Sequence, residues 1–471
     1  MRMPSQQHAP SRPAAEPPSR RVAESSNGLL KILGLSFGLA VAVGNTIGGG
    51  ILRTPGEIAG LLPGIPAFLG IWLIGGLYAL LGANALSELG TMMPRSGGQY
   101  IFARRVFGDY AGFVVGWMDW ISTCASVAAI SIVIGESLVS VFSLSRGLAS
   151  PIAMAIVTAF TILLLRGTKL GDNVQRLTSL AKTLALLVLV AACFMFGKQA
   201  HVDPAAASTA THAAATSGFV AFLLAAQSVI YTYDGWSGPI YFSEELDDPG
   251  RQIPRSMFYS LALVAAIYLL INLAFVYAVP LASFAGSALA AGTVAHAIFG
   301  AAGELLVRVV VIVSLPSAVN ACLLMASRTL YSMSRDGLAV GPATRVNAGG
   351  TPTVALVATG AVALAFLASG TFETIIAIAA FFFVGDYTLS FCAVFALRAR
   401  EPAAARPYRA VGHPWTTGFV LLGSLAFLVS AVVADRRNSL FALGILLASY
   451  PVYRLRRRGA ASPTPAAQYL S

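Results

Sequence analysis

Long apolar runs separated by short polar segments occupy most of this 471-residue chain. An α-helix needs about 20 apolar residues to cross roughly 30 Å of hydrocarbon, and by that measure the runs supply about twelve spans. The runs are continuous rather than alternating, which favours helices over barrel strands. With 56% hydrophobic and 11% charged residues, the chain is too apolar for a soluble protein of this length. We therefore expect an all-α polytopic membrane protein.

The expected spans lie near residues 31–60, 66–92, 109–142, 150–165, 177–196, 218–242, 254–279, 305–333, 352–368, 374–397, 417–434 and 439–453.

The basic residues indicate how the chain crosses the membrane. The net charge is +11, but Lys and Arg form short clusters between apolar runs rather than one patch, so we expect no nucleic acid partner. With a cytoplasmic N-terminus, all but six of the 31 Lys and Arg residues fall on the cytoplasmic side. The positive-inside rule therefore favours cytoplasmic N- and C-termini and an even number of spans. We expect residence in the plasma (inner) membrane. The six exceptions are Arg53, Arg146, Lys198, Arg308, Arg436 and Arg437.

Three consecutive glycines interrupt the first expected span, in the stretch Ile47-Gly48-Gly49-Gly50. Unpaired backbone groups are costly in hydrocarbon, so an unwound run is tolerated where a ligand, an ion or water completes its hydrogen bonds. Glycine also lets a ligand approach the backbone closely. Two interpretations remain open: a binding site, or a close helix–helix contact through Gly44 and Gly48.

The sixth expected span is interrupted as well, by glycine, proline and a carboxylate within residues 231–239. Breaks in the first and sixth of twelve spans are typical of two inverted five-helix repeats, with a substrate site between them near the bilayer midplane. We therefore expect a 5+5 inverted repeat with broken helices 1 and 6, plus two extra C-terminal helices. The expected divisions are a disordered cytoplasmic tail at 1–27, a first five-helix repeat at 28–197, a second inverted repeat at 198–400, helices 11 and 12 at 401–457, and a cytoplasmic C-terminal tail at 458–471.

Three motifs lie in spans one, six and eight. They read Ile47-Gly48-Gly49-Gly50-Ile51-Leu52; Tyr233-Asp234-Gly235-Trp236 followed by Glu244-Glu245, Pro249, Arg251 and Pro254; and Ser317-Ala318-Val319-Asn320 through Ser327-Arg328 to Arg335-Asp336-Gly337. These motifs resemble signatures of the amino acid, polyamine and organocation (APC) transporter superfamily, within it the L-amino-acid transporter branch, over about residues 30–455. The first motif departs from the pattern at Gly49, where a small residue with a side chain is commoner, and at Leu52, where Phe is usual.

The resemblance implies that the two breaks bind an amino acid. A half-helix N-terminus concentrates free N–H groups and about half a positive charge, so the glycine break suits the substrate carboxylate. Free carbonyls near Ile47 and within residues 231–234 suit the ammonium. The resemblance also implies that Tyr231 is a gate over the bound substrate. The expected substrate-binding residues are Ile47, Gly48, Gly49, Gly50, Tyr231 and Asp234.

Two ionisable residues lie inside expected spans. A carboxylate at membrane depth costs roughly 2.5–3.5 kcal/mol on insertion scales, so Asp234 is expected to contact the substrate or sense protons. The alternative is that it caps the second half-helix. By the resemblance, Lys182 falls where many sodium-independent members carry a lysine and sodium-coupled relatives bind an ion. It is then a built-in cation or a proton carrier, unless it snorkels at the cytoplasmic interface.

The expected gating or coupling residues are Lys182, Trp236 and Asn320. Trp236 either packs the hinge of span six or lines the site, and Asn320 either points towards the site or makes a polar contact between helices. Glu244 and Glu245 are expected to be structural or part of an inside gate. Five other charged residues receive no role and are expected near span ends or paired within the bundle: Asp119, Glu136, Glu304, Arg308 and Asp386.

The sequence therefore predicts a secondary active amino acid transporter working by alternating access, either as a sodium-independent exchanger or with protons. Its expected partners are an amino acid, the lipid bilayer and protons. We expect no enzyme activity, no cofactor and no metal site, because no nucleotide-binding loop or ligand-spaced His/Cys/Asp cluster is present in the sequence. A polyamine or cationic amine carrier is the alternative, and a non-transporting amino acid sensor is a further one.

Overall fold

The computed structural model describes residues 29–197, 218–369, 372–434 and 436–459. These ranges form α-helices joined by turns and short 3-10 helices, with two isolated β-bridges in place of any sheet. The tail predicted at 1–27, and most of the one at 458–471, lie outside the described residues. The α-helices are α1 (Leu35–Thr46), α2 (Gly50–Leu61), α3 (Ile65–Met92), α4 (Tyr100–Phe107), α5 (Asp109–Val141), α6 (Ala149–Leu165), α7 (Thr168–Phe196), α9 (Gly218–Thr232), α10 (Pro249–Ala278), α11 (Ala290–Phe299), α12 (Ala301–Ser314), α13 (Pro316–Arg335), α14 (Thr353–Ser369), α15 (Phe372–Arg400), α16 (Trp415–Ala434) and α17 (Arg436–Gly459).

The lengths of the helices fit a polytopic membrane protein. In the described ranges, eight helices are long and apolar enough to cross a membrane, or nine if the bent pair α1 and α2 forms one span. The helices α9 and α14 are shorter but also apolar. The structure therefore confirms the all-α polytopic class, while the count of twelve spans and the two inverted repeats remain predictions.

The predicted spans correspond closely to observed helices. Helix α3 begins one residue before the predicted 66–92, and α5 coincides with 109–142 except for its last residue. The span predicted at 305–333 consists of α12 and α13, which meet at Leu315. Helix α7 begins at Thr168 rather than at 177, and the short helices α4 and α11 are not predicted.

Both predicted interruptions are present. Helices α1 and α2 are bent by 43° relative to each other at the glycine run. Helix α9 ends at Thr232, and turns lead from it to a 3-10 helix, η4 (Gly238–Phe242). Glycine and proline therefore end helical geometry inside these spans, as their backbone preferences lead one to expect.

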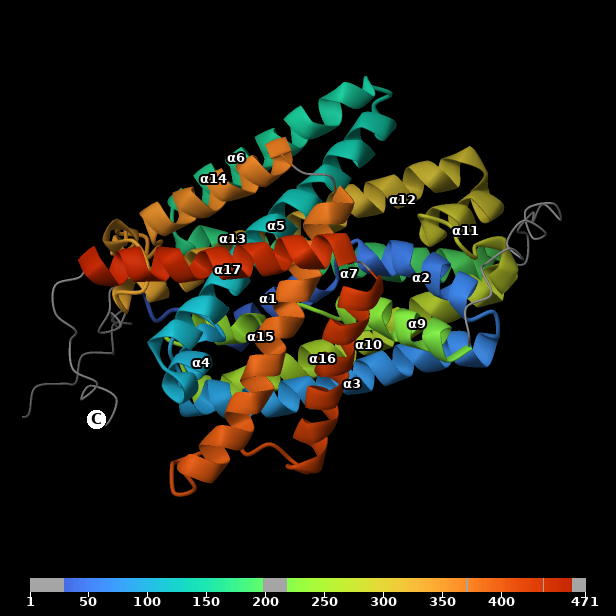
Figure 1. The fold of residues 1–471 in the computed structure, drawn as a ribbon. Coiled ribbons are helices and arrows are strands. Elements are labelled where there is room, and N and C mark those ends of the chain that lie inside the picture. The colour runs from blue at the N-terminus through green and yellow to red at the C-terminus, as the bar shows by residue number, and fades with distance from the viewer. Residues whose placement is uncertain (1–28, 198–217, 370–371, 435, 460–471) are drawn as a thin grey trace, which may run out of the picture.

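The first broken helix lies inside the bundle. Helix α1 packs against α10, α7 and α13, and α5 packs against α15, α13 and α14. In an 18-residue apolar stretch of the span formed by α12 and α13, 78% of the residues are buried within the protein, whereas in the span containing α6 only 17% are buried. In Figure 1, α6 and α14 lie side by side at one margin, while α1 lies among the other helices. The breaks are thus enclosed by protein, which allows an unwound backbone at membrane depth.

Candidate functional site

The first break places a buried lysine at the end of α1. Lys182 of α7 is fully buried, and its Nζ donates to the carbonyls of Gly44, at 2.7 Å, and Ile47. The last carbonyls of a helix lack intrahelical partners and carry partial negative charge. An ammonium group there donates hydrogen bonds to these carbonyls and offsets their charge. Lys182 is therefore not a snorkelling residue at an interface. The Ile47 carbonyl, expected to be free, already has a donor.

The glycines of the first break have two different environments. A Cβ added to Gly44 would lie 2.1 Å from Nε2 of Gln175, so Gly44 allows α1 and α7 to approach closely. A Cβ added to Gly48 or Gly49 would meet no heavy atom within 4 Å among the described residues. The Gly48 N–H already donates to the Thr46 carbonyl at 2.9 Å. The close-contact interpretation therefore fits Gly44, while Gly48 and Gly49 border open space.

The two breaks touch each other. Gly235 has φ +113°, and a Cβ there would lie 2.8 Å from the backbone of Asn45. The Asn45 side chain donates to the Gly235 carbonyl at 3.3 Å. From α10, the hydroxyl of Tyr268 lies within donating distance of the carbonyls of Thr46, at 2.9 Å, and Thr232, at 3.1 Å. Tyr268 thus joins the last residues of α1 and α9. The one signal of this role in the sequence is a hydroxyl group inside an apolar span.

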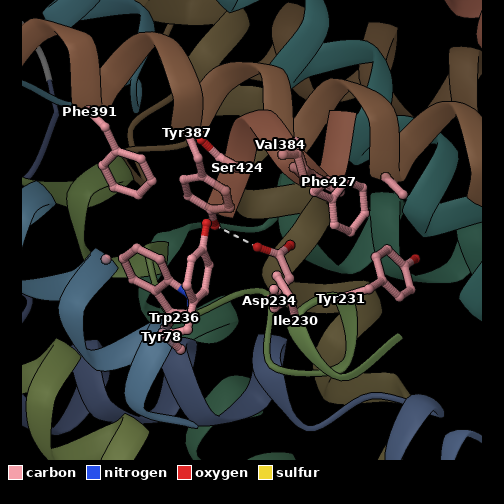
Figure 2. Close-up of a pocket in the computed structure, with 14 residues that line it drawn as sticks. Tyr78, Ile230, Tyr231, Asp234, Trp236, Val384, Tyr387, Phe391, Ser424 and Phe427 are labelled. Carbon is pink, nitrogen blue, oxygen red and sulfur yellow. Dashed lines mark hydrogen bonds between the residues drawn. The ribbon is translucent and has the colours of Figure 1, made fainter. Parts of the chain in front are cut away.

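Asp234 connects the second break to α15. Its Oδ1 accepts a hydrogen bond from the Tyr387 hydroxyl at 2.5 Å. Trp236 stacks on Tyr387 with ring centroids 5.2 Å apart and planes 10° apart. Figure 2 shows these side chains around a cavity, with the ring of Tyr231 beside Asp234. Trp236 therefore packs at the hinge of the second break and lines this cavity, while its place in the substrate site remains a prediction.

This cavity lies on the α15 side of the second break. Its volume is about 30 Å³, which is room for about one or two water molecules. An amino acid does not fit without movement of the surrounding helices. The glycines of the first break do not line the cavity. The lining residues are Tyr78, Ala79, Gly82, Ile230, Tyr231, Asp234, Trp236, Ala380, Phe383, Val384, Tyr387, Phe391, Ser424 and Phe427.

Asn320 of α13 makes a polar contact between helices. Its Nδ2 donates to Oε1 of Gln175 at 2.8 Å and to the Gly171 carbonyl at 3.2 Å, both in α7. Gln175 in turn donates to the Ala40 carbonyl of α1 at 3.0 Å. Of the two interpretations of Asn320, these hydrogen bonds fit the interhelical contact, which holds α13, α7 and α1 together.

Ion pairs bind the C-terminal half of α13 to the segment after η4. Arg328 and Glu245 are both fully buried and form a bidentate pair at 2.8 and 3.0 Å. Two turns further along α13, Arg335 pairs bidentately with Glu244 at 2.7 and 2.9 Å. The guanidinium of Arg328 also lies 5.0 Å from the ring centre of Phe242. Glu244 and Glu245 therefore fasten this end of the bundle and lie away from the cavity.

Asp336, just beyond α13, extends this set of ion pairs. Its carboxylate pairs with Arg95 at 2.8 Å and with Arg104 at 2.5 Å. Burial raises the pKa of Asp336, but the two guanidinium groups lower it more, and the pKa lies below its ordinary value. The carboxylate is thus held in its charged form, which keeps α4 and the segment before it against the end of α13.

The charged residues that received no role have contrasting environments. Glu304 pairs with Arg308 at 2.6 Å, as expected, and Glu136 is exposed in the last turns of α5. Asp119 is fully buried and accepts hydrogen bonds from two hydroxyl groups, those of Tyr241 and Thr329. The expectation is wrong for Asp386: it lies in the middle of α15, fully buried, and neither carboxylate oxygen has a hydrogen-bond partner among the described residues.

The chain is similar to a known protein family and to several characterised proteins. The family model described as amino acid permease matches residues 28–448. The serine/threonine exchanger SteT of Bacillus subtilis (strain 168) is 29% identical over 437 residues, which are 91% of this chain and 97% of the exchanger.

Two mammalian relatives are similar over shorter stretches. The Asc-type amino acid transporter 1 of Mus musculus is 28% identical over 392 residues, covering 81% of this chain and 73% of the relative. The b(0,+)-type amino acid transporter 1 of Mus musculus is 27% identical over 359 residues, covering 74% of this chain and 72% of the relative. All three relatives are named as amino acid transporters or exchangers.

Proposed function

This chain belongs to the amino acid permease family, and from that premise we propose that it is a secondary active transporter that moves L-amino acids by alternating access. The observation that carries the proposal is the direct contact between the two breaks, through Asn45, Gly235 and Tyr268. A site between two broken helices is typical of transporters that rock around a central substrate. The family membership also favours transport over catalysis.

We place the substrate between the breaks. Gly49, the residue before α2, borders open space, and the first N–H groups of α2 lie at the positive end of a helix, which suits the carboxylate. The Ile47 carbonyl is engaged by Lys182, so the ammonium is better served by the second break, near Tyr231 and Asp234. The small cavity beside Asp234 then widens as the substrate enters.

We propose that transport is sodium-independent and proceeds by exchange or with protons. Lys182 supports this, because its ammonium already lies against carbonyls at the end of α1, where a metal cation would need free oxygen atoms. The names of the relatives include an exchanger, which favours exchange.

The chain is an integral multi-pass membrane protein, and we propose that its N- and C-termini are cytoplasmic and that it resides in the plasma membrane. The distribution of Lys and Arg residues supports this orientation. Labelling single cysteines in intact cells, in a variant lacking the four natural cysteines, tests it: reaction of a cysteine at position 12 with an impermeant reagent from outside would overturn the orientation.

Uptake of labelled amino acids into proteoliposomes tests the function. The assay is run in sodium-free buffer, with and without amino acid inside, at two pH values. Uptake that requires internal amino acid means exchange, and uptake into empty vesicles driven by an inward proton gradient means symport. If no amino acid moves but a polyamine does, the cationic amine alternative replaces the proposal. Substrate binding without any movement would indicate a sensor.

A further inference from the structure

Asp386 is a buried acid with no partner. Its side chain is 0% exposed in the middle of α15, and both carboxylate oxygens lack a hydrogen-bond partner among the described residues. The described ion pairs do not include it. An unpaired carboxylate buried in a membrane protein is expensive, and such residues mark ion or proton pathways by default. A neutral carboxylic acid at this position costs far less.

The groups around Asp386 are acidic. Asp119 of α5 and Asp234 of the second break both act on it as like charges, and Tyr241 of η4, whose hydroxyl donates to Asp119, also interacts with it electrostatically. The other helices packed on α15 are α3, α4, α16 and α17, and none of the described ion pairs or hydrogen bonds joins a charged group of these helices to Asp386. A negative charge on Asp386 is therefore opposed by two other carboxylates, and no cation is paired with it among the described residues.

A proton fits this position better than a metal ion. Within the described ranges, no three His, Cys, Asp or Glu side chains come close enough together to hold a metal. The hydroxyl groups of Tyr241 and Thr329 already donate to Asp119. A proton needs a single oxygen atom and removes the charge altogether.

Asp386 is also placed to communicate with the substrate site. The next residue, Tyr387, donates to Asp234 and stacks on Trp236. Of two successive residues of α15, one is thus hydrogen-bonded to Asp234 and the other interacts electrostatically with Asp119 and Asp234. A change of charge at Asp386 therefore takes place one residue away from the side chain that is hydrogen-bonded to Asp234.

We propose that Asp386 is the proton-binding site that couples transport to a proton gradient. In the open state one carboxylate oxygen takes a proton from a hydronium ion: an O–H bond of the hydronium breaks, a water molecule is left, and the new O–H bond makes Asp386 a neutral acid. The neutral acid is then enclosed between α5 and α15 in the closed state, and it returns the proton to water when the opposite side opens. This inference rests on the proposed function and selects proton coupling, with Lys182 as a fixed cation rather than the carrier.

The test compares Asp386→Asn with wild type in proteoliposomes clamped at zero membrane potential. Two assays are run: exchange of amino acid at equal pH on both sides, and accumulation into empty vesicles under an inward proton gradient, with an internal pH-sensitive dye. For one proton per substrate, a gradient of one pH unit supports up to about tenfold accumulation. We expect wild type to show both activities, and the variant to retain measurable exchange but lose accumulation and dye response.

Matched controls separate the possible outcomes. Glu136→Gln removes an exposed carboxylate of α5 and should leave both assays unchanged. Lys182→Met, compared at a temperature at which it remains folded, should keep proton-driven accumulation and the dye response. Absence of exchange by wild type would refute the proposed transport function. Exchange with no proton-driven accumulation in wild type, or accumulation retained by Asp386→Asn, would refute the role of Asp386 alone.

A spectroscopic measurement covers the case in which Asp386→Asn does not fold. Infrared spectra of the wild-type protein at neutral pH should contain the carbonyl band of a protonated, buried carboxylic acid. The Asp386→Glu variant keeps an ionisable group, so the band should shift in frequency while proton-driven accumulation persists. Absence of the band from wild type, or a band that Asp386→Glu does not move, would overturn the assignment.

Discussion

Removing one member of the buried ion pair at the end of α13 should destabilise the protein strongly. Glu245 and Arg328 are both fully buried and bonded bidentately. The substitution Glu245→Gln keeps the shape of the side chain but removes the charge that compensates the guanidinium. Breaking a buried pair in this way costs about 3–5 kcal/mol, because the remaining charge is left uncompensated. The weak contacts of Arg328 with Ser327, at 3.4 Å, and Thr168, at 3.2 Å, replace only part of the lost interaction.

The same substitution at an exposed pair provides the control. Glu304 pairs with Arg308 four residues later at 2.6 Å, and about half of the Glu304 side chain is exposed. Exposed pairs contribute about 0–1 kcal/mol, so Glu304→Gln should change stability little. The assay is unfolding of the purified protein in mixed micelles with increasing denaturing detergent. Equal losses of unfolding free energy for Glu245→Gln and Glu304→Gln would refute the reasoning.

A double substitution separates charge from packing. Replacing a buried ion pair with apolar residues of similar volume is often neutral or stabilising, because neither charge has to be desolvated. We therefore expect Glu245→Met combined with Arg328→Met to recover most of the stability that Glu245→Gln loses. A double variant as unstable as the single one would mean that the pair stabilises the fold through its exact geometry rather than by charge compensation.

Three further substitutions test the site. Lys182→Met removes the donor to the Ile47 carbonyl, and we expect the unfolding free energy to fall by about 1–3 kcal/mol for each carbonyl left without a donor; wild-type stability in a thermal melt would contradict this. Tyr387→Phe deletes the donor to Asp234, and we expect kcat/KM for uptake to fall about tenfold, since such a bond contributes about 1–1.5 kcal/mol; unchanged uptake would remove this contact from the mechanism. Gly49→Ser places a side chain in open space, so we expect normal thermal stability and a lower KM for amino acids, because the hydroxyl adds a donor for the carboxylate. A raised KM would argue that the carboxylate binds elsewhere.

Local signals in the sequence locate the helices and their breaks. The apolar runs predict α3 and α5 to within a residue or two, because the thickness of the bilayer fixes the length of a span. Glycine and proline predict both interruptions, because their effect on the backbone is local. The short helices α4 and α11 are not predicted, since each is too short to cross the hydrocarbon and lies outside the long apolar runs.

Contacts between distant residues are the part that the sequence does not predict. Tyr387 and Asp234 are 153 residues apart, and the hydroxyl of Tyr268 reaches the last carbonyl of α1 from 222 residues away. No local pattern specifies such pairs, because they depend on how the helices pack. Asp386 is a different case: its position inside an apolar run was visible, and a carboxylate at that depth is itself a signal of function.

The contact between Lys182 and the first break has a consequence for how the protein is made. A chain is synthesised from its N-terminus, so α1 reaches the membrane long before α7. Until then, the carbonyls of Gly44 and Ile47 lack the ammonium that lies 138 and 135 residues further along the chain. When the first span is synthesised, these two backbone carbonyls therefore lack the Lys182 donor. They gain it only after α7, the fifth predicted span, has packed beside α1.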